Sequence, residues 1–354
     1  MTRSSWTMIV MALLVGAVIA GSAAAAPLAG PYPTRIDFPA TQFDAAGVAI
    51  PGTGYSPEGI AVSGDTFYAG STATGEVIKG NLKTGDYARG FVPASPNQPS
   101  DVHRGVLGLL VDDHNRLWGA GSYGMACGGT NQPACPAGIT PPRTNYGVLF
   151  VWNATTGAQL AQYTLSTAAA KTINDMTISG NSVFVSNTTA PNGAGTEVQF
   201  RLQLRAGGEL PPGDVPPAAP AAGSVNPAVT VVPSFGYTGA DGIDTLPNGN
   251  VIMNSVAGTS LGDMVVWNAA TNAITPITVT PEPGRVAKAL LSGDGVALDG
   301  NILYYPENRT DVALCPAPNA TLLCPGDIAA VRLNPPDFTT ATVVARINSP
   351  AGSG

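Results

Sequence analysis

The chain has 354 residues, of which only 11% are charged, and its formal net charge is −7. Such a sparse and net negative charge leaves no basic surface for nucleic acid or for anionic lipid, so both classes of partner are excluded. A small-molecule substrate is the expected partner.

The N-terminus has the features of a secretory signal peptide. Arg3 precedes an apolar run over residues 8–20, and small residues lead up to Ala26. Because such a segment is cleaved, we expect residues 1–26 to be removed and the mature protein to be secreted or periplasmic. The run is short for a membrane span and no second run of about 18 apolar residues follows, so no membrane attachment is expected after cleavage.

The four cysteines form two close pairs. Cys127 lies near Cys135 and Cys315 near Cys324, each pair within a stretch rich in Gly, Pro and Ala. In an exported protein such pairs favour local disulfides. Zinc binding is the alternative, but neither pair has the spacing of zinc ligands and neither histidine is placed to complete a site.

The mature chain is predicted to be all-β. Short runs rich in Val, Ile, Thr, Phe and Tyr alternate with turns that contain Gly, Asn and Asp, and no segment keeps a helical period. One phrase recurs: an acidic or amide residue, then Gly or Asp, a short apolar strand, a turn and a second strand. Its copies begin at Glu58, Asn174, Asp241 and Asp294.

Third and fourth strands follow the phrase in several copies. They are expected at 76–79 and 87–92, at 148–152 and 159–163, and at 264–267 and 274–279. Four antiparallel strands per repeat are typical of a β-propeller blade. We therefore expect residues 55–350 to form a β-propeller, with residues 27–54 as an N-terminal arm or a strand that completes the ring.

The number of blades is ambiguous. The residues that follow the polar position are Gly59, Gly108, Asp175, Gly242 and Gly295, with spacings of 49, 67, 67 and 53 residues. These five residues are called the marker residues below. Inserts explain the spacings beyond about 40 to 50 residues, and the stretch 206–227, rich in Pro, Ala and Gly, is expected to be a surface excursion. Five blades are legible, so in a six-bladed ring the sixth would be incomplete or missing.

The residues directly before the markers are expected at one mouth of the propeller channel. They are Glu58, Leu107, Asn174, Asp241 and Asp294, so four of the five carry side-chain oxygens. Converging carboxylates favour a hard divalent cation, and Ca²⁺ fits best because it takes six to eight oxygen ligands, whereas zinc would prefer His or Cys. The alternative is that these residues cap turns and cross-link neighbouring blades through backbone hydrogen bonds.

These motifs resemble a known family. The phrases Pro57-Glu58-Gly59-Ile60-Ala61-Val62, Asn174-Asp175, Asp241-Gly242-Ile243 and Asp294-Gly295-Val296 resemble the SMP-30/gluconolactonase family of calcium-dependent six-bladed β-propeller hydrolases, over about Tyr55 to Leu333. The resemblance implies that Glu58, Asn174, Asp241 and Asp294 hold a metal that binds a lactone or phosphotriester oxygen. The chain departs from the family pattern in two ways. It lacks a clear sixth blade, and the residue before the second marker is the apolar Leu107.

Other residues could take part in the chemistry. Asp241 is the predicted base as well as a ligand. His103, four residues before Leu107, is a candidate base or substrate contact, or alternatively a solvent-exposed loop histidine. Asp175 would hold a water next to the ligands or cap a turn. His114 is expected in a surface hairpin turn.

The leading hypothesis is an exported metal-dependent hydrolase that acts on lactones or related esters. The alternative is a non-catalytic binding or scaffold propeller, because a fold does not carry a function with it.

Overall fold

The protein is described from a computed structural model. It covers residues 33, 36, 38, 42–43, 49–50, 55, 57–72, 74–94, 104–123, 146–166, 172–188, 198–214, 225–233, 237, 239–259, 262–282, 290, 293–307 and 327–348. The predicted signal peptide, the four cysteines and His103 lie outside these residues. Among the described residues no helix is long and apolar enough to cross a membrane.

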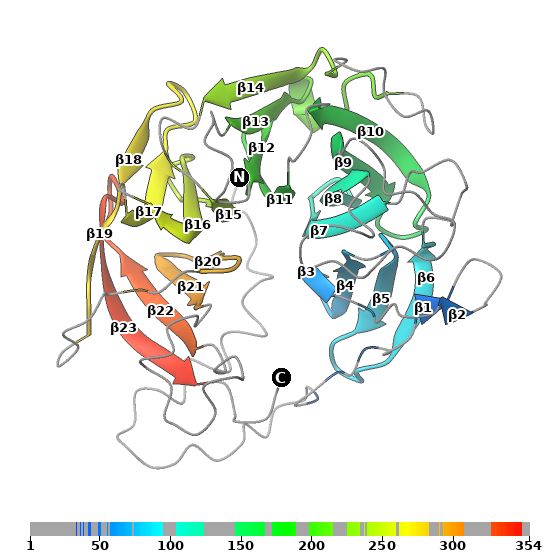
Figure 1. Ribbon diagram of the computed structural model, residues 1–354, viewed down its shortest axis with the longest axis horizontal. Coiled ribbons are helices and arrows are strands. Elements are labelled where there is room, and N and C mark those ends of the chain that lie inside the picture. Colours follow the sequence, from blue (N-terminus) through cyan, green and yellow to red (C-terminus); the bar gives the residue numbers. More distant parts are fainter. Residues whose placement is uncertain are drawn as a thin grey trace. The chain divides into compact units, whose positions relative to one another are not determined.

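The chain divides into two compact units, of which the first contains Met1–Asn174 and Gln203–Val229. Two four-stranded antiparallel sheets with strands in chain order make up most of it (Figure 1). The first is β3 (Pro57–Ser63), β4 (Thr66–Ser71), β5 (Val77–Asn81) and β6 (Tyr87–Val92). The second is β7 (Arg104–Val111), β8 (Arg116–Tyr123), β9 (Tyr146–Asn153) and β10 (Gln159–Ser166).

The second unit contains Asp175–Leu202 and Thr230–Gly354. One of its sheets is β11 (Ile173–Ser179), β12 (Ser182–Asn187), β13 (Val198–Gln203) and β14 (Val229–Pro233), whose ends reach into the first unit. The next is β15 (Ala240–Thr245), β16 (Val251–Thr259), β17 (Gly262–Trp267) and β18 (Ile274–Pro276). The last is β20 (Ala297–Asp299), β21 (Ile302–Pro306), β22 (Asp327–Leu333) and β23 (Thr340–Asn348), to which β19 (Thr278–Thr280) adds in parallel.

Each of these sheets is a propeller blade, and the predicted class, an all-β propeller built of four-stranded antiparallel blades, is confirmed. Five blades are legible among the described residues. The third and fourth strands predicted for the first two blades are confirmed as β5 and β6 and as β9 and β10. In the blade that begins with β15, β17 is confirmed, whereas β18 covers only residues 274–276 of the predicted 274–279, and residues 278–279 belong to β19. The one helical element described is a short 3₁₀ turn, η1 (Ala206–Gly208).

The strands in the middle of the blades are apolar on both faces because both faces are covered. In β9 the residues from Val148 to Trp152 are all at most 1% exposed. Such near-continuous burial explains why apolar and polar residues do not alternate along these strands, as they would in a sheet with one solvent-exposed face. In the first unit Trp152 stacks on Phe150, with ring centroids 5.4 Å apart.

The N-terminal segment contacts the first blade where it is described. The Phe38 ring lies 5.6 Å from that of Tyr55 and 6.3 Å from that of Phe67. Two short strands, β1 (Gln42–Phe43) and β2 (Ala49–Ile50), pair with each other. The role of residues 27–54 in completing a ring stays a prediction.

The stretch 206–227, expected as a surface excursion, is described at residues 206–214 and 225–227. Its described residues run along β10, the outermost strand of the second blade: the amides of Asp214 and Asn226 donate to the carbonyl oxygens of Gln162 and Thr164, at 2.8 and 3.0 Å. The Tyr163 hydroxyl also donates to the carbonyl oxygen of Pro211, at 2.9 Å. Asp214 and Asn226 thereby satisfy two backbone carbonyls of an otherwise open sheet edge.

Candidate functional site

The repeated phrase lies at a β-bulge near the start of the first strand of the blade. The pairing with the second strand shifts between Pro57 and Ile60 in β3, between Val106 and Leu109 in β7, and between Ala240 and Ile243 in β15. In each case the shift spans two residues, the marker glycine and the residue directly before it. Bulges bend a strand and re-aim its side chains, and they are frequent next to active sites.

Two of the marker glycines, Gly59 and Gly242, are required because consecutive first strands nearly touch there. A Cβ atom on Gly59 would lie 1.8 Å from the carbonyl oxygen of Leu107, within the first unit. In the second unit a Cβ atom on Gly242 would lie 2.3 Å from the carbonyl carbon of Gly295. No side chain fits such distances, so the glycines allow neighbouring blades to pack at this level.

The predicted metal ligands differ in burial. In the first unit Glu58 is exposed on β3, and Asn174 on β11 is 7% exposed. In the second unit Asp241 on β15 is 4% exposed, and Asp294, shortly before β20, is exposed. Leu107 is buried, as suits its apolar side chain. The set of four ligands stays a prediction.

Asp175 links two blades of the second unit. Its Oδ1 accepts a hydrogen bond from the amide of Met176 at 2.8 Å, and its Oδ2 accepts one from the amide of Ile243 on β15 at 3.2 Å. The Ser186 hydroxyl accepts from the Asp175 amide at 3.0 Å and donates to the carbonyl oxygen of Asp241. Asp175, a marker residue, therefore makes a cross-link between blades of the kind considered for the residues directly before the markers.

Asp244 repeats this arrangement one blade later. Its Oδ1 accepts from the amide of Thr245 at 2.6 Å and its Oδ2 from the amide of Leu298 on β20 at 2.9 Å. Each carboxylate thus holds the next amide of its own strand and one amide of the following blade.

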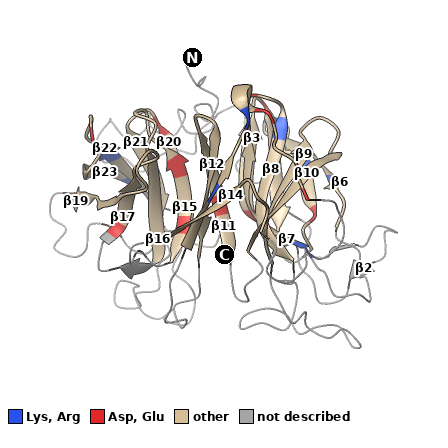
Figure 2. Ribbon diagram, turned by 90° about the horizontal axis from the view of Figure 1, so that it is seen from above, with Lys and Arg blue, Asp and Glu red and all other residues tan. Residues whose placement is uncertain are grey.

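These carboxylates share a negative field. Burial raises the pKa of Asp175 to about 7, its two backbone hydrogen bonds oppose the rise, and the charges of Asp244 and Asp294 add to it. In Figure 2 acidic residues, in red, colour parts of β11, β15 and β20. The first strands of the second unit therefore concentrate negative charge.

A second acidic group, Asp112, Asp113 and His114, places three possible ligand atoms within 4.8 Å of one another. Asp112 is already engaged by the chain: its Oδ1 accepts from the amides of His114 and Arg116, and its Oδ2 accepts from Arg116 Nε at 2.6 Å and Trp118 Nε1 at 2.7 Å. The group stabilises the β7–β8 turn, and the predicted exposed position of His114 in a hairpin is confirmed.

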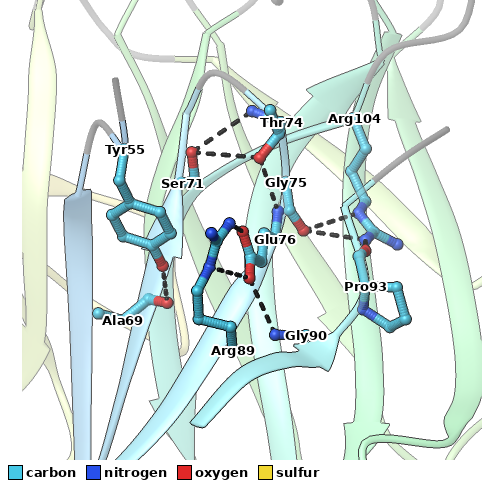
Figure 3. Close-up of polar contacts among 10 residues, drawn as sticks. All are labelled: Tyr55, Ala69, Ser71, Thr74, Gly75, Glu76, Arg89, Gly90, Pro93 and Arg104. Carbon is cyan, nitrogen blue, oxygen red and sulfur yellow. Dashed lines mark hydrogen bonds and ion pairs between the residues drawn. The ribbon is translucent and has the colours of Figure 1, made fainter. Parts of the chain in front are cut away.

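Sequence analysis missed a polar network in the first unit, drawn in Figure 3. Glu76 is buried, and its carboxylate accepts from Arg89 Nε and Nη2 at 3.2 and 2.7 Å and from the Gly90 amide at 2.9 Å. Arg104 Nε and Nη2 donate to the carbonyl oxygen of Gly75 at 3.1 and 2.9 Å. Arg104 therefore ties the second blade to the first.

Sequence analysis also missed buried polar residues near the end of the second strand of the blade. In the first unit Ser71 pairs with Pro57 and Ser122 with Gly105. In the second unit Ser255 pairs with Ala240, and Glu307 bridges to Gly293. All four polar residues are at most 2% exposed. The sequence signal that could have revealed these residues is a Ser or Glu directly after the apolar residues of a second strand.

Fold and blade repeat together define a β-propeller. No family model matches the chain, and no curated protein matches it. Among solved structures it is similar to the major allergen Mala s 1 of Malassezia sympodialis, with 13% identity and a TM-score of 0.50 over 83% of this chain and 79% of that one. This likeness shows the fold alone.

A second solved structure is the PQQ-bound aldose sugar dehydrogenase of Streptomyces coelicolor, with 13% identity and a TM-score of 0.44 over 91% of this chain and 87% of that one. A TM-score this low carries no argument. Membership of the SMP-30/gluconolactonase family stays a prediction.

Proposed function

We propose that the protein is an exported β-propeller hydrolase that acts on lactones or related esters with the help of a bound divalent cation, Ca²⁺ in the first place. The observation that supports this function is the close approach of Gly242 and Gly295 in the second unit, because the residues directly before them, Asp241 and Asp294, are both carboxylates. Carboxylates that crowd together repel unless a proton or a cation neutralises them. A cation does so without protonating any of them.

The donor set suits a hard cation. Both oxygens of Asp175 and of Asp244 accept backbone hydrogen bonds, so these residues hold the strands rather than the ion. Asp241 and Asp294 are the proposed ligands in the second unit. Glu58 and Asn174 stay ligands predicted from the sequence repeat. Carboxylate and amide oxygens are the ligands that Ca²⁺ prefers.

The chain's own groups have distinct parts in such a reaction. A bound cation would polarise the ester carbonyl and lower the pKa of a bound water. Asp241, a buried carboxylate at the β15 bulge, is the proposed acceptor of the water's proton. Two residues position Asp241. Asp175 accepts a hydrogen bond from the β15 backbone amide of Ile243, and the Ser186 hydroxyl donates one to the carbonyl oxygen of Asp241. His103 stays a second candidate base.

The test is a hydrolysis assay with aldonolactones, acyl lactones and aryl phosphotriesters, with and without Ca²⁺. We expect kcat/KM for at least one class to fall by about 100-fold or more in Asp241→Asn, the loss typical of a removed general base. Glu58→Gln should also reduce turnover. Asp86→Asn, a substitution at an exposed position of the β5–β6 turn, should leave it unchanged.

Two results would overturn this function. The first is no turnover of any substrate class with Ca²⁺ present, which would favour a binding or scaffold propeller. The second is turnover that survives both a chelator and the Asp241→Asn substitution.

A further inference from the structure

Asn254 carries a buried oxygen that the fold does not use. It lies on β16 and is 0% exposed, and its Oδ1 has no hydrogen-bond partner among the described residues. Its Nδ2 donates to the carbonyl oxygen of Gly295 at 3.2 Å, and its side chain also bonds Tyr305. Exchanging the amide oxygen and nitrogen would set the side-chain oxygen against that carbonyl, so Gly295 fixes the orientation. A buried acceptor left open in this way requires an explanation.

The register places Asn254 opposite the proposed base. In the β15–β16 pair Ala240 lies opposite Ser255 and Ile243 opposite Met253, so Asp241 and Gly242 share Asn254 as the residue across the bulge. The corresponding residue across the β3 bulge is Gly70, and across the β7 bulge it is Ala120. The bulge itself therefore needs no polar side chain at this position.

The next blade of the second unit encloses the Asn254 side chain. A Cβ atom on Gly293 would lie 2.5 Å from Asn254 Nδ2 and 2.3 Å from the Tyr305 ring. Since glycine is the residue that fits there, no side chain at position 293 competes for the open oxygen. A species that reaches Oδ1 must be small.

The surroundings are acidic. Burial raises the pKa of the Tyr305 hydroxyl, and the charges of Asp263, Glu307 and Asp241 add to the rise, so these three carboxylates lie near Tyr305. Glu307 is ion-paired with Arg346, which also pairs with Glu282 at 2.6 Å. Several carboxylates of the second unit therefore lie within electrostatic reach of the Asn254 side chain and its neighbour Tyr305.

We propose that Oδ1 of Asn254 is a ligand of the divalent cation, so that the metal site extends from the first strand of the blade to the second. This inference rests on the proposed function, because it adds a ligand to the same site next to Asp241. A neutral amide oxygen is a common Ca²⁺ ligand, and it adds a donor without adding repulsion between carboxylates.

The test is Ca²⁺ binding to the full mature chain, measured by isothermal titration calorimetry. Asn254→Ala copies the residue found across the β7 bulge, and we expect it to weaken Ca²⁺ binding by about tenfold or more, in the range seen when metal-site residues are removed. Asn254→Asp keeps an oxygen in place and should bind Ca²⁺ within about threefold of wild type or more tightly.

Asn226→Ala is the matched control. It removes a buried amide of the first unit whose Oδ1 and Nδ2 are both hydrogen-bonded, to the amide of Ala228 and to Asp214. It should lower the melting temperature while leaving the Ca²⁺ affinity unchanged. Should Asn254→Ala fail to fold, Asn254→Ser is the second variant, with the same weakening expected.

The outcomes separate this inference from the function on which it rests. Wild-type Ca²⁺ affinity retained in Asn254→Ala, or in Asn254→Ser where that variant is used, would overturn the role of Asn254 and leave the hydrolase proposal intact, with Oδ1 satisfied by a buried water. No Ca²⁺ binding by the wild type would overturn both.

Discussion

The carboxylate of Asp175 accepts a hydrogen bond from the amide of Ile243, 68 residues further along the chain and one blade away. Asp244 and Leu298 repeat the relationship over 54 residues. Each separation is one residue longer than the spacing of the corresponding marker residues, 67 and 53. In the second unit some acidic residues of the first strands thus join neighbouring blades, and others are the proposed metal ligands.

Removing this link should destabilise the second unit. Asp175→Ala leaves the amides of Met176 and Ile243 without their acceptor, and we expect a loss of about 2 kcal/mol in the free energy of unfolding. Hydrogen exchange should speed up at these two amides. Asp86→Ala serves as the control and should stay within about 0.5 kcal/mol of wild type. Unchanged exchange at Ile243 in the Asp175 variant would disprove the link.

A methyl group at a marker glycine should be poorly tolerated. Gly59→Ala forces a Cβ atom against the carbonyl oxygen of Leu107, and we expect a loss of about 3 kcal/mol or a collapse of soluble yield. Gly64→Ala is the matched control, since Gly64 has φ +60° but open space around it, and its cost should be about 1 kcal/mol. Equal urea midpoints for the two variants would argue against close packing at Gly59.

The buried ion pair in Figure 3 can be tested by a double-mutant cycle. Arg89→Met leaves the buried carboxylate of Glu76 without its counter-charge and should cost about 3 kcal/mol, because a buried charge left unpaired is expensive. Arg89→Met combined with Glu76→Met removes that carboxylate as well and should be more stable than the single Arg89 variant. Urea unfolding measures all members of the cycle. Strictly additive losses would show that the two residues do not interact.

Tyr163 should make stability depend on pH under alkaline conditions. Burial raises the pKa of its hydroxyl from 10.0 to about 12, so the folded state keeps a proton that the unfolded state loses. The stabilisation is complete below pH 10 and is lost as the pH rises through 12. Tyr163→Phe should cost about 1 kcal/mol at pH 8, where the bond to Pro211 is lost, and the difference from wild type should narrow above pH 10. A difference that stays constant up to pH 11 would contradict the raised pKa.

The blades were predictable from the sequence because their signals are local. Gly59 and Gly242 recur before short apolar strands, and the structure shows why: neighbouring backbones leave no room for a Cβ atom. Asp175 was predicted to hold a water or to cap a turn. It does cap the amide of Met176, but its bond to Ile243 depends on the register between blades, which local sequence does not define.

Asn254 shows what the sequence could not reveal. It stands within the apolar strand β16, and its burial depends on Gly293 and Gly295, which follow 39 and 41 residues later. A side-chain oxygen without a hydrogen bond can be recognised only when the positions of the neighbouring donors are known in three dimensions. The same limit applies to Asp214 and Asn226, which lie in a stretch rich in Pro, Ala and Gly although their amides bond the backbone of β10.

The central claim is that carboxylates at the start of the first strands hold a divalent cation. Its most direct test is the melting temperature of wild type, Asp241→Ala, Asp294→Ala and the control Asp86→Ala as Ca²⁺ is added. At a Ca²⁺ concentration of about 100 times Kd, binding stabilises the folded state by about 2.7 kcal/mol, which corresponds to a rise of several degrees. We expect this rise in wild type and in Asp86→Ala and its loss in the other two variants. A wild-type melting temperature that responds to no divalent cation would contradict the claim.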